Sequence, residues 1–135
     1  MVRDAVGTWN LGEIDYLFIE NVGNLVCPAS FDLGQHRSVA LLSYTEGDDK
    51  PAKYPVLFRG ADLVLLTKSD LAPHMEDFEP ARAERCVREL ASAAPVHSLS
   101  ARKGTNLRPW LDWVRAGLAS VREAHSHDHR ERVAG

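Results

Sequence analysis

Four residues with recognisable chemistry, Thr67-Lys68-Ser69-Asp70, follow directly on the apolar run Leu63–Leu66. A carboxylate held on a loop can accept two parallel hydrogen bonds from guanine, one from N1–H and one from the 2-amino group. Adenine offers neither donor, so a buried carboxylate opposite it would stay unpaired at a cost of about 1–3 kcal/mol. The stem of Lys68 can lie along a base while its ammonium stays at the edge. The alternative is a solvated loop in which Asp70 caps the next helix.

A second polar motif, Ser100-Ala101-Arg102, follows another short strand-like run that begins at Val96. Between the two motifs, residues 80–94 have near-helical apolar spacing and predict a helix with Pro80 in its first turn. The chain therefore alternates strand, polar motif and helix twice. In open α/β sheets, ligands bind at the carboxyl ends of the strands, where the two motifs lie in this order. Together they indicate a ligand site more strongly than either motif alone.

The remaining pattern predicts an α/β fold with a mostly parallel sheet flanked by helices. Residues 14–19 and 38–44 predict two further strands, and residues 53–60 a short helix or turn. The last helix is expected to begin near Asn106, a good N-cap residue. Its apolar stripe consists of Leu107, Trp110, Leu111, Val114, Leu118 and Val121.

The composition excludes several classes of protein. At 135 residues, with 44% hydrophobic and 26% charged residues, the chain is one globular domain or part of one. A net charge of −3 implies no general affinity for nucleic acid or anionic membranes. No apolar run approaches the ~20 residues of a membrane span. The two cysteines, Cys27 and Cys86, do not make a disulfide framework, so a reducing, cytoplasmic location is the simplest interpretation.

Several stretches resemble known GTPase sequences. Thr67-Lys68-x-Asp70 resembles the guanine-specificity motif of GTPases, and Ser100-Ala101-Arg102 resembles the loop whose backbone N–H groups meet the guanine O6. The run Leu17–Gly34 is similar to the signature of HypB, the family of hydrogenase nickel-incorporation GTPases. The stretches Thr45–Pro51 and Lys53–Pro55 extend this resemblance, which covers about residues 14–118.

The resemblance implies a partial P-loop NTPase domain of the SIMIBI class, which binds GTP or GDP with Mg²⁺. Glu20 would then lie near Mg²⁺, where the family usually has Asp, and the N–H of Gly23 would meet the γ-phosphate. A strand followed by a simple turn is the alternative for these two residues. The implied guanine-binding residues are Thr67, Lys68, Asp70, Ser100, Ala101 and Arg102.

The phosphate-binding loop Gly-x-x-x-x-Gly-Lys-Ser/Thr does not occur in the sequence. In the family this loop precedes the strand that ends at Glu20, so the chain is similar to the C-terminal portion of HypB. We expect an irregular lead-in (residues 1–13), the GTPase portion (14–122) and a polar, disordered tail (123–135). Without the P-loop strand, the strands beside it would have an unpaired edge or pair with each other. Alone, the chain is expected to hydrolyse GTP negligibly.

A metal site is also implied by the resemblance. Cys27 matches the cysteine that binds Ni²⁺ or Zn²⁺ across a dimer interface in the family, and thiolate suits both metals. The other family ligands form an adjacent Cys-His pair, which this sequence lacks. In an extended tail, His125, His127 and His129 would point to one side and could supply imidazoles. The alternatives are a buried small cysteine and a solvated tail.

The implied partners are a second copy of the chain, a HypA-like metallochaperone and the large subunit of [NiFe]-hydrogenase. The implied function is GTP binding and hydrolysis coupled to nickel delivery into that hydrogenase. Two alternatives remain open from the sequence. The chain could be a non-enzymatic nickel- or zinc-binding or partner-docking module derived from HypB, or a fragment without an independent role.

Overall fold

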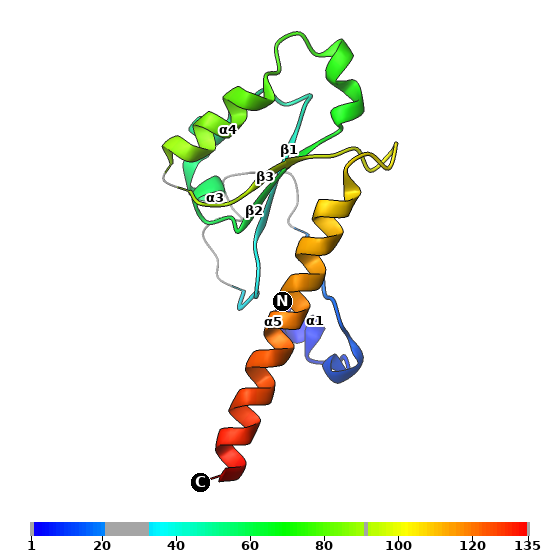
Figure 1. The fold of residues 1–135 in the computed structure, drawn as a ribbon, viewed down its shortest axis with the longest axis vertical. Helices are drawn as coiled ribbons and strands as arrows, with labels where there is room; N and C mark the ends of the chain where they lie inside the picture. Colours follow the sequence, from blue (N-terminus) through cyan, green and yellow to red (C-terminus); the bar gives the residue numbers. More distant parts are fainter. Residues whose placement is uncertain (1, 21–32, 91, 135) are drawn as a thin grey trace.

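The computed structural model describes residues 2–20, 33–90 and 92–134, of which 2–3 and 126–134 are described by their backbone only. Figure 1 shows a small sheet between short helices on one side and a long C-terminal helix on the other. The elements in chain order are α1 (Val2–Val6), η1 (Leu11–Glu13), β1 (Val39–Ser43), α2 (Lys50–Lys53), α3 (Pro55–Arg59), β2 (Leu63–Thr67), η3 (Ser69–His74), α4 (Pro80–Glu89), β3 (Val96–Ser98) and α5 (Leu107–Ala134).

The three strands of the described residues form one parallel sheet in the order β1-β2-β3. Val39 is opposite Leu63 at one end of the β1–β2 pair, and Ser43 is opposite Thr67 at the other. On the other side of β2, Leu66 is opposite Ser98. The predicted α/β class with a parallel sheet flanked by helices is therefore confirmed, and three of the predicted strands are present. Because the strands are parallel, their polar carboxyl ends meet at one edge.

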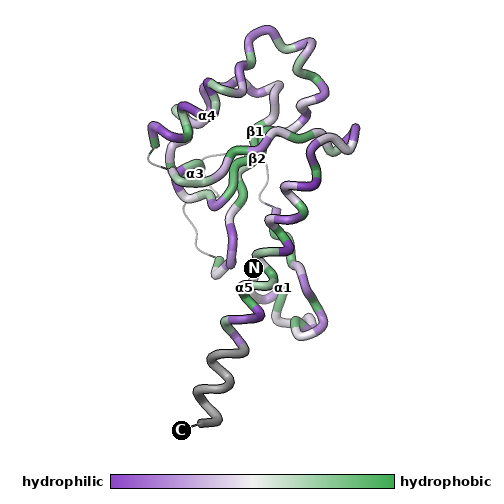
Figure 2. The backbone as a smooth tube through the Cα atoms, viewed as in Figure 1, coloured by the Kyte–Doolittle hydropathy of each residue, from purple (hydrophilic) through white to green (hydrophobic). Residues whose placement is uncertain are grey.

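Apolar side chains alternate between the two faces of the sheet, and each face has its own core. On one face, Leu42 and Leu66 pack with Phe58 of α3 and Val87 of α4, all almost fully buried. On the other face, Leu63, Leu65 and Leu99 pack against the first turns of α5 through Trp110 and Trp113. Figure 2 shows the strands as the most continuously hydrophobic part of the backbone. A sheet buried on both faces explains the unbroken apolar sequence of β2.

The helices between the strands begin at prolines. Pro51, Pro55 and Pro80 stand at the starts of α2, α3 and α4, where a missing N–H costs nothing. The expected helix or turn over 53–60 is α3. The expected helix over 80–94 is shorter than predicted, because α4 ends at Glu89. Beyond it, the guanidinium of Arg88 donates to the carbonyl oxygens of Ser92 (2.9 Å) and Ala94 (2.7 Å), which stabilises the chain in a non-helical conformation.

The predicted strand over residues 14–19 is wrong. These residues are extended but form no ladder with the sheet, and their side chains are all exposed. The segment lies instead beside α5, where Asp15 pairs with Arg122. An extended chain becomes a strand only when a neighbour binds its N–H and C=O groups, and no described strand lies next to this one.

The long helix α5 continues to Ala134, through the residues for which a disordered tail was expected. Its start at Leu107 agrees with the expectation for Asn106, although Asn106 itself has a left-handed backbone (φ 55°). Within the part of the chain that the structure describes, no helix combines the length and hydrophobicity that a membrane span requires.

Candidate functional site

The two polar motifs lie side by side at the carboxyl ends of β2 and β3. Lys68 leaves β2 in the left-handed conformation (φ 61°, ψ 38°), which turns the chain sharply into η3. The backbone N–H of Ser69 then donates to the carbonyl oxygen of Leu99, at 3.1 Å. This bond joins the loop after β2 to the loop after β3, so the fold brings together the two motifs that the sequence separates by 30 residues.

A direct contact joins the central side chains of the two motifs. The hydroxyl of Ser100 donates to Oδ1 of Asp70 at 2.6 Å, and the Ser100 side chain is fully buried. This hydrogen bond holds the pKa of Asp70 below its usual range, with smaller contributions from the charges of Arg102 and Lys103. The carboxylate is therefore ionised and held in one orientation at neutral pH, which suits it to accept hydrogen bonds from a ligand.

The loop that contains Ser100 is closed by its own backbone. Ser100 and Thr105 exchange both backbone hydrogen bonds at 3.0 Å, and the N–H of Lys103 donates to Ser100 Oγ at 3.2 Å. Gly104 provides the left-handed conformation (φ 70°) that this tight turn requires. Ala101 and Arg102 are exposed at the tip of the turn.

Chemically, this arrangement fits one edge of a planar base. A carboxylate oriented by a buried hydroxyl faces solvent beside an exposed lysine, and a tight turn presents its residues next to them. Thr67 is half-buried at the end of β2, where its carbonyl oxygen accepts the N–H of Tyr44. The six residues predicted to bind guanine therefore lie together at the carboxyl ends of β2 and β3, and their binding of guanine stays a prediction.

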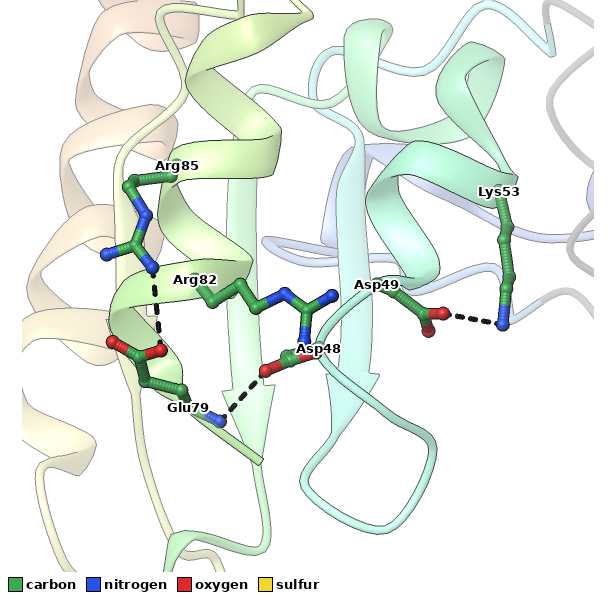
Figure 3. Close-up of polar contacts among 6 residues, drawn as sticks. All are labelled: Asp48, Asp49, Lys53, Glu79, Arg82 and Arg85. Carbon is green, nitrogen blue, oxygen red and sulfur yellow. Dashed lines mark hydrogen bonds and ion pairs between the residues drawn. The ribbon is translucent and has the colours of Figure 1, made fainter. Parts of the chain in front are cut away.

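A charged cluster near this edge was not predicted from the sequence. Asp48, 4% exposed, accepts a hydrogen bond from the backbone N–H of Glu79 at 3.1 Å and pairs with Arg82 at 3.4 Å. Figure 3 shows Asp48 on the loop after β1, with its carboxylate facing Glu79 and Arg82 at the start of α4. The neighbouring Asp49 pairs with Lys53 at 2.6 Å on the surface. The sequence around Asp48 indicates only a turn, because its partners lie 31 and more residues away.

The predicted phosphate and metal residues are not assembled by the described structure. Glu20 is exposed at the end of the unpaired segment, and Gly23 and Cys27 lie outside the described residues. No group of three His, Cys, Asp or Glu side chains that could hold a metal ion occurs among the residues the structure describes.

The histidines of the C-terminal stretch lie on α5 rather than on an extended tail. The expectation that a spacing of two brings them to one side is therefore wrong for a helix. Positions 125 and 129 lie about one turn apart, and position 127 lies away from both. Nδ1 of His125 donates to the carbonyl oxygen of Val121 at 2.8 Å, and the side chains of the other two lie outside the description.

Comparison with known protein families identifies a match over most of the chain. Residues 2–98 match the family described as "CobW/HypB/UreG, nucleotide-binding domain". The chain is 47% identical over 114 residues to hydrogenase maturation factor HypB of Escherichia coli K12, covering 84% of this chain and 39% of that protein. It is 53% identical over 131 residues to HypB of Azotobacter vinelandii, covering 91% of this chain and 43% of that protein.

Solved structures agree with these sequence matches. The crystal structure of HypB from Archaeoglobus fulgidus superposes with a TM-score of 0.67 at 34% identity, over 72% of this chain and 47% of that one. HypB from Helicobacter pylori in complex with nickel gives a TM-score of 0.64 at 35% identity, over 76% and 46%. The chain thus spans less than half the length of these relatives. It belongs to the CobW/HypB/UreG family of nucleotide-binding domains and is a homologue of HypB.

Proposed function

We propose that this chain is the guanine-binding portion of a hydrogenase maturation factor of the HypB type. The observation that carries the proposal is the 2.6 Å hydrogen bond from Ser100 to Asp70, which joins the two motifs into one site. In the proposed complex, the carboxylate of Asp70 accepts N1–H and the 2-amino group of guanine. Adenine has neither donor, so it leaves the carboxylate unpaired and binds more weakly.

The other residues of the site complete the recognition of the base. The exposed stem of Lys68 lies along the base, and its ammonium remains in solvent. Backbone N–H groups of Ala101 and Arg102, at the tip of the turn after β3, meet the guanine O6. Thr67 fixes the position from which Lys68 and Asp70 extend, through its carbonyl hydrogen bond to the N–H of Tyr44.

Phosphate binding is the weaker half of the proposed site. Mg²⁺ and the γ-phosphate would lie near Glu20 and Gly23, where the metal would supply charge neutralisation at the phosphates. The described residues do not assemble this part, and the sequence contains no Gly-x-x-x-x-Gly-Lys-Ser/Thr loop. We therefore propose that the chain alone binds guanine nucleotides weakly and hydrolyses GTP negligibly.

The wider function follows the curated relatives, which are hydrogenase maturation factors. We propose GTP-dependent delivery of nickel to [NiFe]-hydrogenase in the cytoplasm, with a homodimer, a HypA-like metallochaperone and the hydrogenase large subunit as partners. Cys27 would bind Ni²⁺ or Zn²⁺, and His125, His127 and His129 could add imidazole ligands. One solved relative, HypB of Helicobacter pylori, is a nickel complex.

Guanine recognition can be tested by titrating the ¹⁵N-labelled chain with GDP and with ADP in the presence of Mg²⁺. We expect saturable shifts of the Ser69 and Lys103 amides with GDP, and at least ~10-fold weaker binding of ADP. The Asp70→Ala variant should lose this preference, whereas Asp112→Ala, on the exposed side of α5, should retain it. Equal binding of the two nucleotides, or no shifts at the two loops, would refute the proposed function.

A further inference from the structure

Tyr44, the residue that follows β1, contacts the ends of both β2 and β3, the two strands that carry the proposed guanine motifs. Tyr44 is only 4% exposed, although Thr45 and Glu46 directly after it are exposed. Its backbone N–H donates to the carbonyl oxygen of Thr67 at 3.1 Å. This bond continues the β1–β2 ladder to the residue before Lys68, so it fixes where the loop of the first motif begins.

The hydroxyl of Tyr44 reaches across β2 to the third strand. Its Oη forms a hydrogen bond of 3.2 Å with Oγ of Ser98, although β1 and β3 are separated by β2 in the sheet. Two residues after Ser98, the hydroxyl of Ser100 makes the contact to Asp70. Leu99, between these two serines, is bonded to β2 and to the loop after it. Its N–H donates to the carbonyl oxygen of Leu66, and its carbonyl oxygen accepts from the N–H of Ser69.

The ring of Tyr44 is itself fixed from the opposite side. It stacks on Phe78 with the ring centroids 4.2 Å apart and the planes 24° from parallel. Phe78 precedes Glu79, whose N–H is bonded to the buried carboxylate of Asp48. The hydroxyl therefore extends from a ring that is packed on one side and anchored to the start of α4, and it can hold Ser98 in one position.

From these contacts we infer that Tyr44 is a positioning residue for guanine recognition, acting through Ser98 and the carbonyl of Thr67. This inference rests on the proposed function of the site. Recognition of a base requires its partners to be held within ~0.5 Å, and the Tyr44–Ser98 bond fixes the end of β3 two residues before Ser100. Without the hydroxyl, Ser98 loses its partner and the Ser100 loop gains freedom relative to Asp70.

The Tyr44→Phe variant tests this inference, because it removes the hydroxyl and keeps the stacked ring. Tyr54→Phe is a matched control, since the Tyr54 hydroxyl makes no hydrogen bond among the described residues. The first readout is amide hydrogen exchange. We expect exchange to rise about tenfold at Ser69 and Leu99 in Tyr44→Phe, which corresponds to about 1.4 kcal/mol of local opening. The amide of Val64, near the start of β2 and bonded to the carbonyl oxygen of Pro95, should be unchanged.

The second readout is the preference for GDP over ADP, measured as described above. We expect this preference to fall at least threefold in Tyr44→Phe and to be unchanged in Tyr54→Phe. Ser98→Ala should have the same effect as Tyr44→Phe, and the double variant should lose no more than either single one, because one hydrogen bond is removed in all three.

The outcomes separate this inference from the proposed function. Unchanged exchange at Ser69 and Leu99, or an equal rise there and at Val64, would overturn a positioning role for Tyr44. A GDP preference that survives in Tyr44→Phe would overturn it as well. If the unmodified chain shows no preference for GDP, the proposed function fails, and the positioning inference, which rests on it, is overturned too, whatever the exchange at the two loops shows.

Discussion

Two extended apolar segments of this chain have opposite fates. In β2, Leu63 and Val64 are fully buried, between β1 and β3 and between two layers of helix. In the segment 14–19, Phe18 is 69% exposed and no residue enters the sheet. The two segments have similar β-forming sequences, so intrinsic preference does not account for the difference. A strand forms where neighbours on both sides satisfy its backbone and helices cover its faces.

The same difference extends to the polar residues at the ends of the two segments. After β2, Asp70 has a fixed orientation because Ser100 and the Leu99–Ser69 bond hold the loop. After the unpaired segment, Glu20 makes no hydrogen bond or ion pair with the residues the structure describes. Polar residues acquire a defined geometry only when the strand before them is itself anchored. The residues proposed to bind guanine are therefore held together, whereas Glu20 has no partner among the residues the structure describes.

The largest expected effect separates the buried core from the exposed segment. Phe58→Ala removes a ring that is 0% exposed beneath β1 and β2, and should lower the free energy of unfolding by about 3–5 kcal/mol. Phe18→Ala removes a ring that is mostly exposed to solvent, and should change the free energy of unfolding by less than ~0.5 kcal/mol. Urea denaturation followed by circular dichroism measures both. Similar effects of the two substitutions would mean that segment 14–19 is packed in solution.

A smaller effect is expected from the buried carboxylate that joins the loop after β1 to α4. Asp48→Ala removes the acceptor of the Glu79 N–H and should lower the free energy of unfolding by about 1–3 kcal/mol. Arg82 is half exposed, so its ion pair contributes less than this hydrogen bond. Asp49→Ala is the matched control, since the adjacent pair with Lys53 is solvated and should matter little. Urea denaturation measures both variants. Equal midpoints for Asp48→Ala and Asp49→Ala would contradict a stabilising role for the buried Asp48 carboxylate.

The smallest effect concerns the ionisation of Asp70. Because the Ser100 hydroxyl is the main cause of its lowered pKa, Ser100→Ala should raise the pKa of Asp70 toward its usual range. A ¹³C NMR titration of the carboxyl groups measures this change. Asp49 is an internal control, since its pKa is lowered chiefly by the hydrogen bond to Lys53 and should not move. An unchanged Asp70 pKa would show that the Ser100 contact is absent in solution.

The sign of the accompanying pH dependence follows from linkage. A carboxyl whose pKa is lowered in the folded state adds stability above its unfolded pKa, which is about 4 for Asp. That stability is lost as the pH falls from about 4 through the lower folded pKa. The Ser100→Ala variant should therefore lose less stability than the unmodified chain over this acidic range.

Several elements could be predicted because their signals are local. The unbroken apolar run of β2 predicted a buried strand, and the proline at the start of α4 predicted a helix there. The order of the two polar motifs predicted that they lie close together, as the Ser100–Asp70 contact shows. The limits of α4 and the long α5 were not predicted. Arg88 ends α4 through contacts with residues that follow it, and α5 continues through a polar stretch whose sequence contains no signal for a helix.

By itself, the sequence determined the parallel α/β pattern and the two motifs at the ends of successive strands, because apolar periodicity and turn residues act over short distances. Only the tertiary structure decided which segments pair. It left residues 14–19 outside the sheet, joined Asp48 to the start of α4 and connected Tyr44 to Ser98 across β2. These contacts join residues 31 and 54 positions apart, and such pairing depends on the position of a third strand or helix that no local pattern contains.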